Sequence, residues 1–175
     1  MQQRRRFGEH QRTKDFCAQT VKQFFEQQGR MKDVLEFDSS SATVQEAANV
    51  LKVIPARIAK TLSFQDLEDS ALLVVAAGDA KIDNSKFKQQ FGIKAKMLAA
   101  DVVVEQTGHP VGGVCPFALA NELPVYLDIS LKRFASVFPA CGSANSAIEL
   151  TCDELENYAQ AVRWFLSRIL PVCTL

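Results

Sequence analysis

The chain has 175 residues, of which 47% are hydrophobic, enough to fill the core of one compact domain. Its 20 basic and 20 acidic side chains cancel, so no overall field favours sequence-independent binding to nucleic acid. No apolar run approaches the ~18 residues of a membrane span, and the five widely spaced cysteines form no CxxC pair. We therefore expect a cytoplasmic protein with reduced thiols and no membrane partner.

The N-terminal part separates into a basic tail and a helix. Residues 1–13 are rich in arginine, and no apolar stretch typical of a secretory signal follows them. We expect a solvated tail here. Residues 14–28 are predicted to form an amphipathic helix that ends at Gly29, and residues 34–37 a short strand.

The sequence predicts helices before Lys60 and a strand directly after it. Thr43 and Glu46 have the spacing of a capping box and predict the start of a helix. Pro55 suits the first turn of a further short helix, and residues 61–65 alternate as a strand does. Lys60 is therefore expected where a helix ends and a strand begins, with its amine projecting into a cleft. The alternative is an ordinary surface lysine.

A long apolar segment marks the centre of the fold. Residues 71–77 predict a central strand that is buried on both faces. Asp83 is placed to cap a following helix, residues 94–99 predict a strand, and Asp101 is expected to cap another helix. A lysine-rich segment here predicts either a phosphate-facing patch or a solvated helix face; its lysines are Lys81, Lys86, Lys88, Lys94 and Lys96.

The last third of the chain completes the fold. Strands are predicted at 124–129, 136–142 and 146–150. Thr151 and Glu154 form a second capping box, which predicts a helix over residues 152–166. Together these elements predict a single mixed α/β domain over residues 14–170, with six or seven short strands.

Several enzyme signatures are absent. The sequence contains no GxGxxG after a strand, no GxxxxGK[ST], no GxSxG and no HExxH. Its two histidines, His10 and His109, are too few for a metal site of several histidines. We therefore expect neither a metal nor a cofactor.

The loop GHPVGGVCPF, residues 108–117, is the strongest candidate for a site. Gly112 and Gly113 lack Cβ atoms, so the backbone can approach a ligand and present two successive N–H groups to a carbonyl or an oxyanion. Pro116 is expected to stiffen the loop. The alternative is a tight turn that binds nothing.

Cys115 and His109 allow a second interpretation of the same loop. A thiolate activated by a neighbouring imidazole is a nucleophile, which predicts a thiol hydrolase. The alternative is that Cys115 packs in the core beside the proline.

Five segments, in their order and spacing, resemble the YbaK-like aminoacyl-tRNA deacylases, a family related to the editing domain of bacterial prolyl-tRNA synthetases. They are TVQEAA (43–48), IAKTLSF (58–64), VVAAGDAKID (74–83), TGHPVGGVCPF (107–117) and PVYLDISL (124–131). The resemblance covers about residues 20–155 and leaves the arginine-rich start outside, for which an arm that contacts tRNA is the alternative to a solvated tail. It implies a single α/β domain with a mixed, barrel-like sheet and surrounding helices.

The resemblance also implies which residues form the site. Lys60 matches the family's functional lysine, and residues 112–116 match its G-x-x-x-P loop. The expected catalytic residues are Lys60, Gly112 and Gly113. The expected substrate-binding residues are Val114, Cys115, Pro116, Gly78, Asp79 and His109. Cys115 is expected to form a wall of the amino-acid pocket, where relatives often carry a hydroxyl or another small residue.

The implied activity is trans-acting hydrolysis of the ester between a mischarged small amino acid and the 3′-terminal adenosine of tRNA, with proline tRNA as the expected carrier. Synthetases discriminate one methylene by only about 1–3 kcal/mol, which creates the need for a second sieve. The ester is already activated, so Lys60 and the loop backbone need only position it for attack by water or a ribose hydroxyl. The expected partners are aminoacyl-tRNA and a prolyl-tRNA synthetase. The alternative is a module that binds charged tRNA or a synthetase without hydrolysis.

Overall fold

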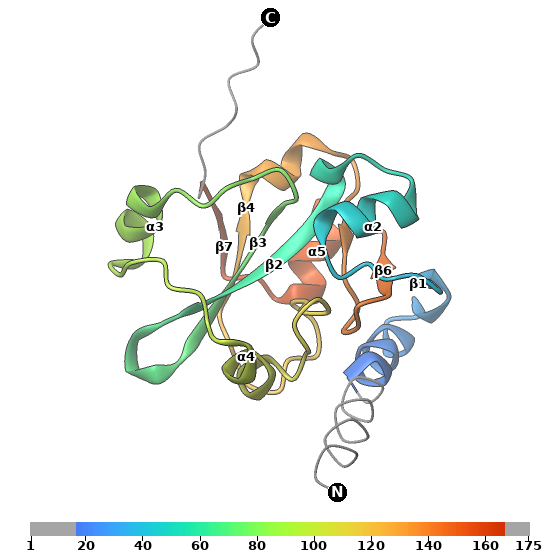
Figure 1. Cartoon of the computed structure of the whole chain (residues 1–175), viewed down its shortest axis with the longest axis horizontal. Helices are drawn as coiled ribbons and strands as arrows, with labels where there is room; N and C mark the ends of the chain where they lie inside the picture. The colour runs from blue at the N-terminus through green and yellow to red at the C-terminus, as the bar shows by residue number, and fades with distance from the viewer. Residues whose placement is uncertain (1–16, 167–175) are drawn as a thin grey trace, which may run out of the picture.

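The computed structural model describes residues 17–166 (Figure 1). Its first helix covers residues 17–27, and Gly29 follows with a φ of +71°, in the left-handed region that commonly ends helices. This agrees with a helix predicted to end before Gly29. Residues 14–16 of the predicted helix and the basic tail predicted at 1–13 lie outside the described residues. No helix in the described range is long and apolar enough to cross a membrane.

A five-stranded mixed sheet forms the centre of the domain. Its strands, in spatial order, are β5 (Phe138–Pro139), β2 (Ile58–Gln65), β3 (Ala71–Ala77), β4 (Val125–Asp128) and β7 (Arg163–Phe165). β2 and β3 are antiparallel, and the other neighbouring pairs are parallel. Every residue of β3 is buried, as its apolar sequence predicts.

A second, two-stranded sheet pairs β1 (Val34–Glu36) with β6 (Ser146–Ile148) in antiparallel register. Isolated bridges connect this sheet to the segment that contains β5; they join Val137 to Leu150 and Ala140 to Ala147. Over residues 17–166 the two sheets, connected by these bridges, contain seven short strands, where the sequence predicts six or seven.

Helices lie around the two sheets (Figure 1). They are α2 (Val44–Leu51), α3 (Asn84–Phe91), α4 (Ala100–Thr107) and α5 (Cys152–Ala159). Short 3₁₀ helices occupy several connections: η1 (Met31–Asp33), η2 (Pro55–Arg57), η3 (Leu67–Asp69) and η4 (Ile129–Arg133). The capping boxes predicted at Thr43 and Thr151 are both present, and Asp83 caps α3 as predicted.

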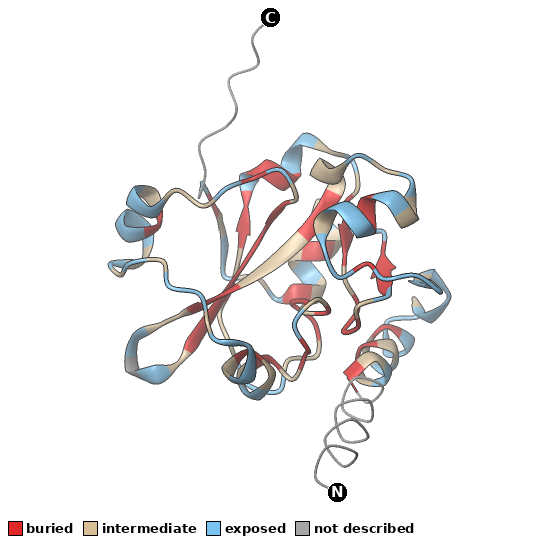
Figure 2. Ribbon diagram, in the orientation of Figure 1, coloured by how far each residue is buried: buried red, intermediate tan, exposed pale blue. Residues whose placement is uncertain are grey.

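Apolar side chains cover both faces of the five-stranded sheet. On one face, Phe25 of the first helix and Leu155 of α5 join a cluster with residues of β3 and β4. On the other face, Phe87 of α3 packs on Phe64 of β2 with their ring centroids 4.8 Å apart. Figure 2 shows buried residues along the whole of β3. The five-stranded sheet is therefore packed on both faces, and this packing holds its strands in place.

Residues 94–99 do not form the predicted strand. Within this segment Met97 alone makes an isolated bridge, to Phe64 of β2. Most of its side chains are exposed, so they bury no face that would extend the pairing. Asp101 is not a cap either, because Ala99 occupies the N-cap position and Asp101 lies in the first turn of α4.

Two further boundaries differ from the prediction. The helix expected over 152–166 ends at Ala159, because Gln160 is left-handed with a φ of +48° and residues 163–165 pair with β4 instead. The helix before β2 is only the single turn η2, so Lys60 is the third residue of β2 rather than a residue at a junction. Its backbone is thus held by hydrogen bonds of the sheet.

Candidate active site

A cavity of about 400 Å³ opens beside β2. Its walls come from β2, α2, α4, the loop at 111–114 and the strands β5 and β6. Small residues leave much of the space: Ala42, Ala47, Ala59, Gly112, Ala140 and Ala147. Lys60 is the only charged residue among the described residues that line the cavity. Within residues 17–166, no group of three or more His, Cys, Asp or Glu side chains is arranged to hold a metal ion.

The Lys60 ammonium is held by the turn that follows β3. Its Nζ donates to the carbonyl oxygen of Gly78 at 3.1 Å and to that of Ala80. An ammonium group has three N–H donors, so these two bonds leave one for a ligand. The side chain is half-buried and lines the cavity. Lys60 is therefore oriented by the protein and retains one donor.

Burial lowers the pKa of Lys60 below its ordinary value, because desolvation penalises the charged form. The negative charges of Asp79 and Asp128 oppose this effect, and the positive charge of Lys81 adds to it. The protonation of Lys60 therefore depends on how its neighbouring carboxylates are held.

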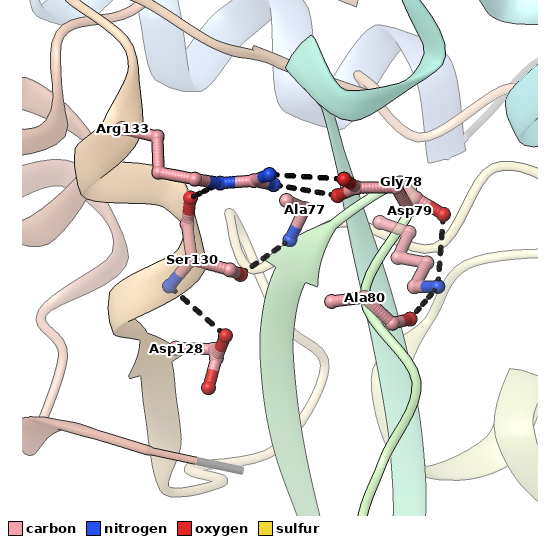
Figure 3. A network of polar contacts seen from close by, with 8 residues as sticks. Ala77, Gly78, Asp79, Ala80, Asp128, Ser130 and Arg133 are labelled. Carbon is pink, nitrogen blue, oxygen red and sulfur yellow. Dashed lines mark hydrogen bonds and ion pairs between the residues drawn. The ribbon is translucent and has the colours of Figure 1, made fainter. Parts of the chain in front are cut away.

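A polar network anchors Asp79 and the turn to η4 (Figure 3). Arg133 donates to both carboxylate oxygens of Asp79, at 2.9 and 2.5 Å, and its Nε donates to the Ser130 carbonyl at 2.8 Å. The Ser130 hydroxyl accepts the Ala77 N–H at 3.0 Å. The Ser130 N–H in turn donates to the buried carboxylate of Asp128 at 3.0 Å. The support of Lys60 thus extends through β3, β4 and η4.

Gly78 packs the same turn against η2. A Cβ at this position would lie 2.1 Å from the carbonyl oxygen of Pro55 and 2.6 Å from a methyl of Val44. Glycine is required because the Pro55 backbone cannot withdraw as a flexible side chain can. Gly78 and Asp79 do not line the cavity, so the structure gives them contacts with Lys60 and Arg133 rather than with the cavity interior.

Gly112 and Val114 of the predicted loop do line the cavity. Gly112 has a φ of +89°, and a Cβ there would lie 2.9 Å from the Cβ of Ala42. Both the conformation and the close approach favour glycine. Within residues 17–166, no backbone carbonyl accepts the Gly112 N–H.

Gly113 is placed differently from the expectation that both glycines present N–H groups to a ligand. Its N–H donates to the Pro110 carbonyl at 2.9 Å and closes the turn. Gly113 is buried, and a Cβ there would lie 2.7 Å from backbone atoms of Ser143. The Gly113 amide is therefore engaged within the loop. The lack of a Cβ at Gly113 instead allows the loop backbone to lie close to the backbone of Ser143.

Cys115, Pro116 and His109 are buried behind the cavity wall and do not line it. The Cys115 side chain is 0% exposed, and its Sγ lies 3.5 Å from His109 Nε2 and 3.7 Å from the Phe117 carbonyl oxygen. Burial raises the pKa of Cys115 to about 12 and lowers the pKa of His109, so both groups stay neutral at pH 7. The structure therefore places Cys115 in the core and not among the residues that line the cavity.

Several polar residues of the cavity wall were missed by sequence reasoning. They include Ser41, Thr61, Ser63 and Ser146. Thr61 Oγ1 is buried and has no hydrogen-bond partner among the described residues. Thr61 lies inside the IAKTLSF segment, so that motif contained a signal for it. Nothing in the local sequence pointed to Ser146 or to Arg133, because their contacts come from chain folding.

The chain is similar to several known proteins. Residues 38–158 match the family model of the aminoacyl-tRNA editing domain. The uncharacterized protein YwhH of Bacillus subtilis (strain 168) is 57% identical over 145 residues, which cover 83% of this chain and 92% of that protein. A proline–tRNA ligase of Bacillus pumilus (strain SAFR-032) is 30% identical over 106 residues, or 60% of this chain, and the match spans only 18% of the ligase.

Solved structures have the same fold. One described as a proposed trans-editing enzyme for prolyl tRNA synthetase matches with a TM-score of 0.79 and 27% identity, over 87% of this chain and 97% of the other. The hypothetical protein APE2540 matches with a TM-score of 0.68 and 33% identity, over 75% of this chain and 87% of its own. These matches confirm the single α/β domain with a mixed sheet. The chain belongs to the aminoacyl-tRNA editing domain family.

Proposed function

We propose that this protein is a trans-acting hydrolase that removes a mischarged small amino acid from proline tRNA. Family membership supports the editing role, and the ligase and trans-editing relatives support proline tRNA as the carrier. The observation that carries the proposal is the Lys60 ammonium, oriented by two carbonyls in the wall of a cavity whose other described lining residues are uncharged. Charged tRNA is a cytoplasmic substrate, and a prolyl-tRNA synthetase is the partner from which the enzyme would receive it.

Lys60 acts in this proposal as a cation and not as a general base. The two carbonyl acceptors favour its protonated form, although burial opposes it. Its remaining N–H binds an oxygen of the terminal ribose or phosphate. Lys60 thereby orients the ester against the loop that contains Gly112.

The bond cleavage requires little more than positioning. A water oxygen adds to the ester carbonyl carbon, and the charge that develops on the carbonyl oxygen is bound by the Gly112 N–H. The bond to the ribose 3′-oxygen then breaks, and that oxygen takes up the proton that water releases. Net hydrolysis needs water, because attack by the neighbouring ribose hydroxyl alone only moves the acyl group along the ribose.

The lining of the cavity supports a small, uncharged amino acid. Its alanine side chains give space without polar contacts, while Ser63 and Ser146 add hydroxyl groups. Apart from Lys60, no described lining residue offers a charge to pair with a charged side chain. We therefore expect alanine, serine or cysteine as the amino acid removed.

The test is a deacylation panel with proline tRNA charged with alanine, serine or cysteine. Wild type, Lys60→Ala and the control Lys32→Ala, at an exposed lysine on η1, are compared at equal concentration. We expect wild type and the control to release at least one amino acid, and Lys60→Ala to be slower by on the order of a hundredfold. Hydrolysis of none by wild type, or full activity in Lys60→Ala, would contradict the proposal. Stoichiometric binding of charged tRNA without release would instead indicate a binding module.

A further inference from the structure

The lysine-rich segment over residues 81–96, here called the basic segment, is not used by the proposed chemistry. It contains five lysines and a single acidic residue, Asp83, in a chain whose total charge is zero. Four of the lysines are exposed: Lys81, Lys88, Lys94 and Lys96. The positive charge on this surface is therefore a local feature and not a property of the whole chain.

These exposed lysines are not engaged in ion pairs within residues 17–166. The ion pairs in this range are formed by Lys22, Arg30, Arg57 and Arg133, and none involves one of the four exposed lysines. The one acid, Asp83, uses its carboxylate to accept the Lys86 N–H at 2.9 Å as the cap of α3. Within residues 17–166, the four exposed lysines of the basic segment thus present cations that no ion pair neutralises.

The basic segment reaches the mouth of the cavity. Lys96 directly precedes Met97 and Leu98, which both line the cavity. Two backbone bonds hold this end to β2: the Gln65 N–H donates to Lys96 O at 2.8 Å, and the Leu98 N–H donates to a β2 carbonyl at 3.1 Å. In Figure 1 the chain passes from α3 across the front of β2 to α4.

The other end of the segment is close to the catalytic lysine. Lys81 lies near enough to Lys60 for its charge to act on it. Lys81 follows Ala80, whose carbonyl accepts a hydrogen bond from Lys60. The two ends of the basic segment therefore lie beside the site: Lys81 follows the turn that holds Lys60, and Lys96 precedes the lining residue Met97.

We propose that the basic segment binds the sugar-phosphate backbone of the RNA whose terminal ester enters the cavity. This inference rests on the proposed function. An ester in the cavity continues into a phosphate chain that must leave the cavity. Lys81 directly follows Ala80, whose carbonyl holds Lys60, and Lys96 directly precedes the lining residue Met97, so both lysines are placed to meet that chain. Exposed lysines act as point charges for phosphates and carry no sequence information, which suits contacts to a backbone.

The experiment compares two substrates that carry the same ester. One is full-length aminoacyl-tRNA, and the other is the same amino acid on adenosine, which lacks the phosphate chain. The variant Lys94→Glu/Lys96→Glu is compared with the control Lys32→Glu/Lys52→Glu, which makes the same charge change at two exposed lysines outside the segment.

For Lys94→Glu/Lys96→Glu we expect KM for aminoacyl-tRNA to rise by about tenfold or more, because phosphate contacts dominate affinity. The slope of log KM against log salt should fall by about 0.7–0.9 for each phosphate that the variant no longer neutralises. We expect kcat on aminoacyl-tRNA, and kcat/KM on the adenosine ester, to match wild type. An unchanged KM for aminoacyl-tRNA, an equal decrease in kcat/KM on both substrates, or an equal effect of the control would overturn the inference.

Failure of the proposed function is detected separately. If wild type hydrolyses neither substrate, binding of deacylated proline tRNA is followed by fluorescence anisotropy. Weaker binding by Lys94→Glu/Lys96→Glu than by the control supports the basic segment as an RNA surface even then. Equal binding by wild type, variant and control overturns it and leaves an acidic protein partner as the occupant to test next.

Discussion

Arg133 donates two hydrogen bonds to the carboxylate of Asp79, a residue 54 positions earlier in the chain. Asp79 lies in the turn whose carbonyls hold Lys60, and its negative charge opposes the effect of burial on the pKa of Lys60. One ion pair therefore connects both the position and the charge of the candidate catalytic lysine to η4. Substitution of Asp79 and substitution of Arg133 should therefore affect activity in different ways.

Asp79→Asn removes the carboxylate charge and keeps the size of the side chain. Burial already lowers the pKa of Lys60, and loss of the Asp79 charge lowers it further. If the ammonium is the active form, activity is lost at a lower pH than in wild type. We expect the alkaline limb of the kcat/KM–pH profile to move to lower pH, with Asp38→Asn, an exposed site, as the control. An alkaline limb that stays at its wild-type pH would contradict this role.

Arg133→Met removes the anchor of the turn but leaves the Asp79 carboxylate. Both side chains are about one-third exposed, at 34% and 32%, so solvent screens the pair and the free energy of unfolding should fall by less than about 1 kcal/mol. We expect kcat to fall on the order of tenfold, because a displaced turn misplaces Lys60. The alkaline limb should not move to lower pH, in contrast to Asp79→Asn. Urea denaturation and steady-state kinetics measure these effects, and a wild-type kcat would count against the anchor.

Gly78→Ala tests the close approach of the turn to η2. The added Cβ would lie 2.1 Å from the Pro55 carbonyl oxygen, so the backbone must shift. We expect a loss of more than about 2 kcal/mol in the free energy of unfolding, together with a large loss of deacylation. Gly92→Ala is the matched control: its Cβ has open space, and its positive φ alone costs about 1 kcal/mol. Equal stability and activity of the two variants would show that the close approach is unimportant.

Cys115→Ala tests whether the thiol takes part in the chemistry. The side chain is fully buried and its pKa is raised to about 12, so we expect kcat to stay within about twofold of wild type. The loss of the buried sulfur should lower the free energy of unfolding by about 1–2 kcal/mol. Peptide mass spectrometry after iodoacetamide treatment of the folded protein should find Cys115 unmodified. Rapid alkylation, or inactivity of a folded Cys115→Ala, would restore the thiol hydrolase hypothesis.

Local signals in the sequence were sufficient to predict most of the helices and strands. The capping boxes at Thr43 and Thr151 and the buried strand β3 are where the sequence predicts them, because each depends on residues a few positions apart. The prediction failed at 152–166, where a left-handed Gln160 ends the helix and the following segment becomes β7. That outcome depends on the free edge of β4, which lies far away in the sequence.

By itself, the sequence determined the fold class, the place of Lys60 in a motif and the loop that contains Gly112. Only the tertiary structure decided which groups face the cavity. In the folded chain the Gly113 amide donates to the Pro110 carbonyl, Cys115 is buried in the core, and Arg133 donates to the Asp79 carboxylate. The physical reason is that the residue type determines only which interactions a side chain or amide is able to make. Burial and hydrogen-bond partners, which come from distant segments, decide whether it remains available to a ligand.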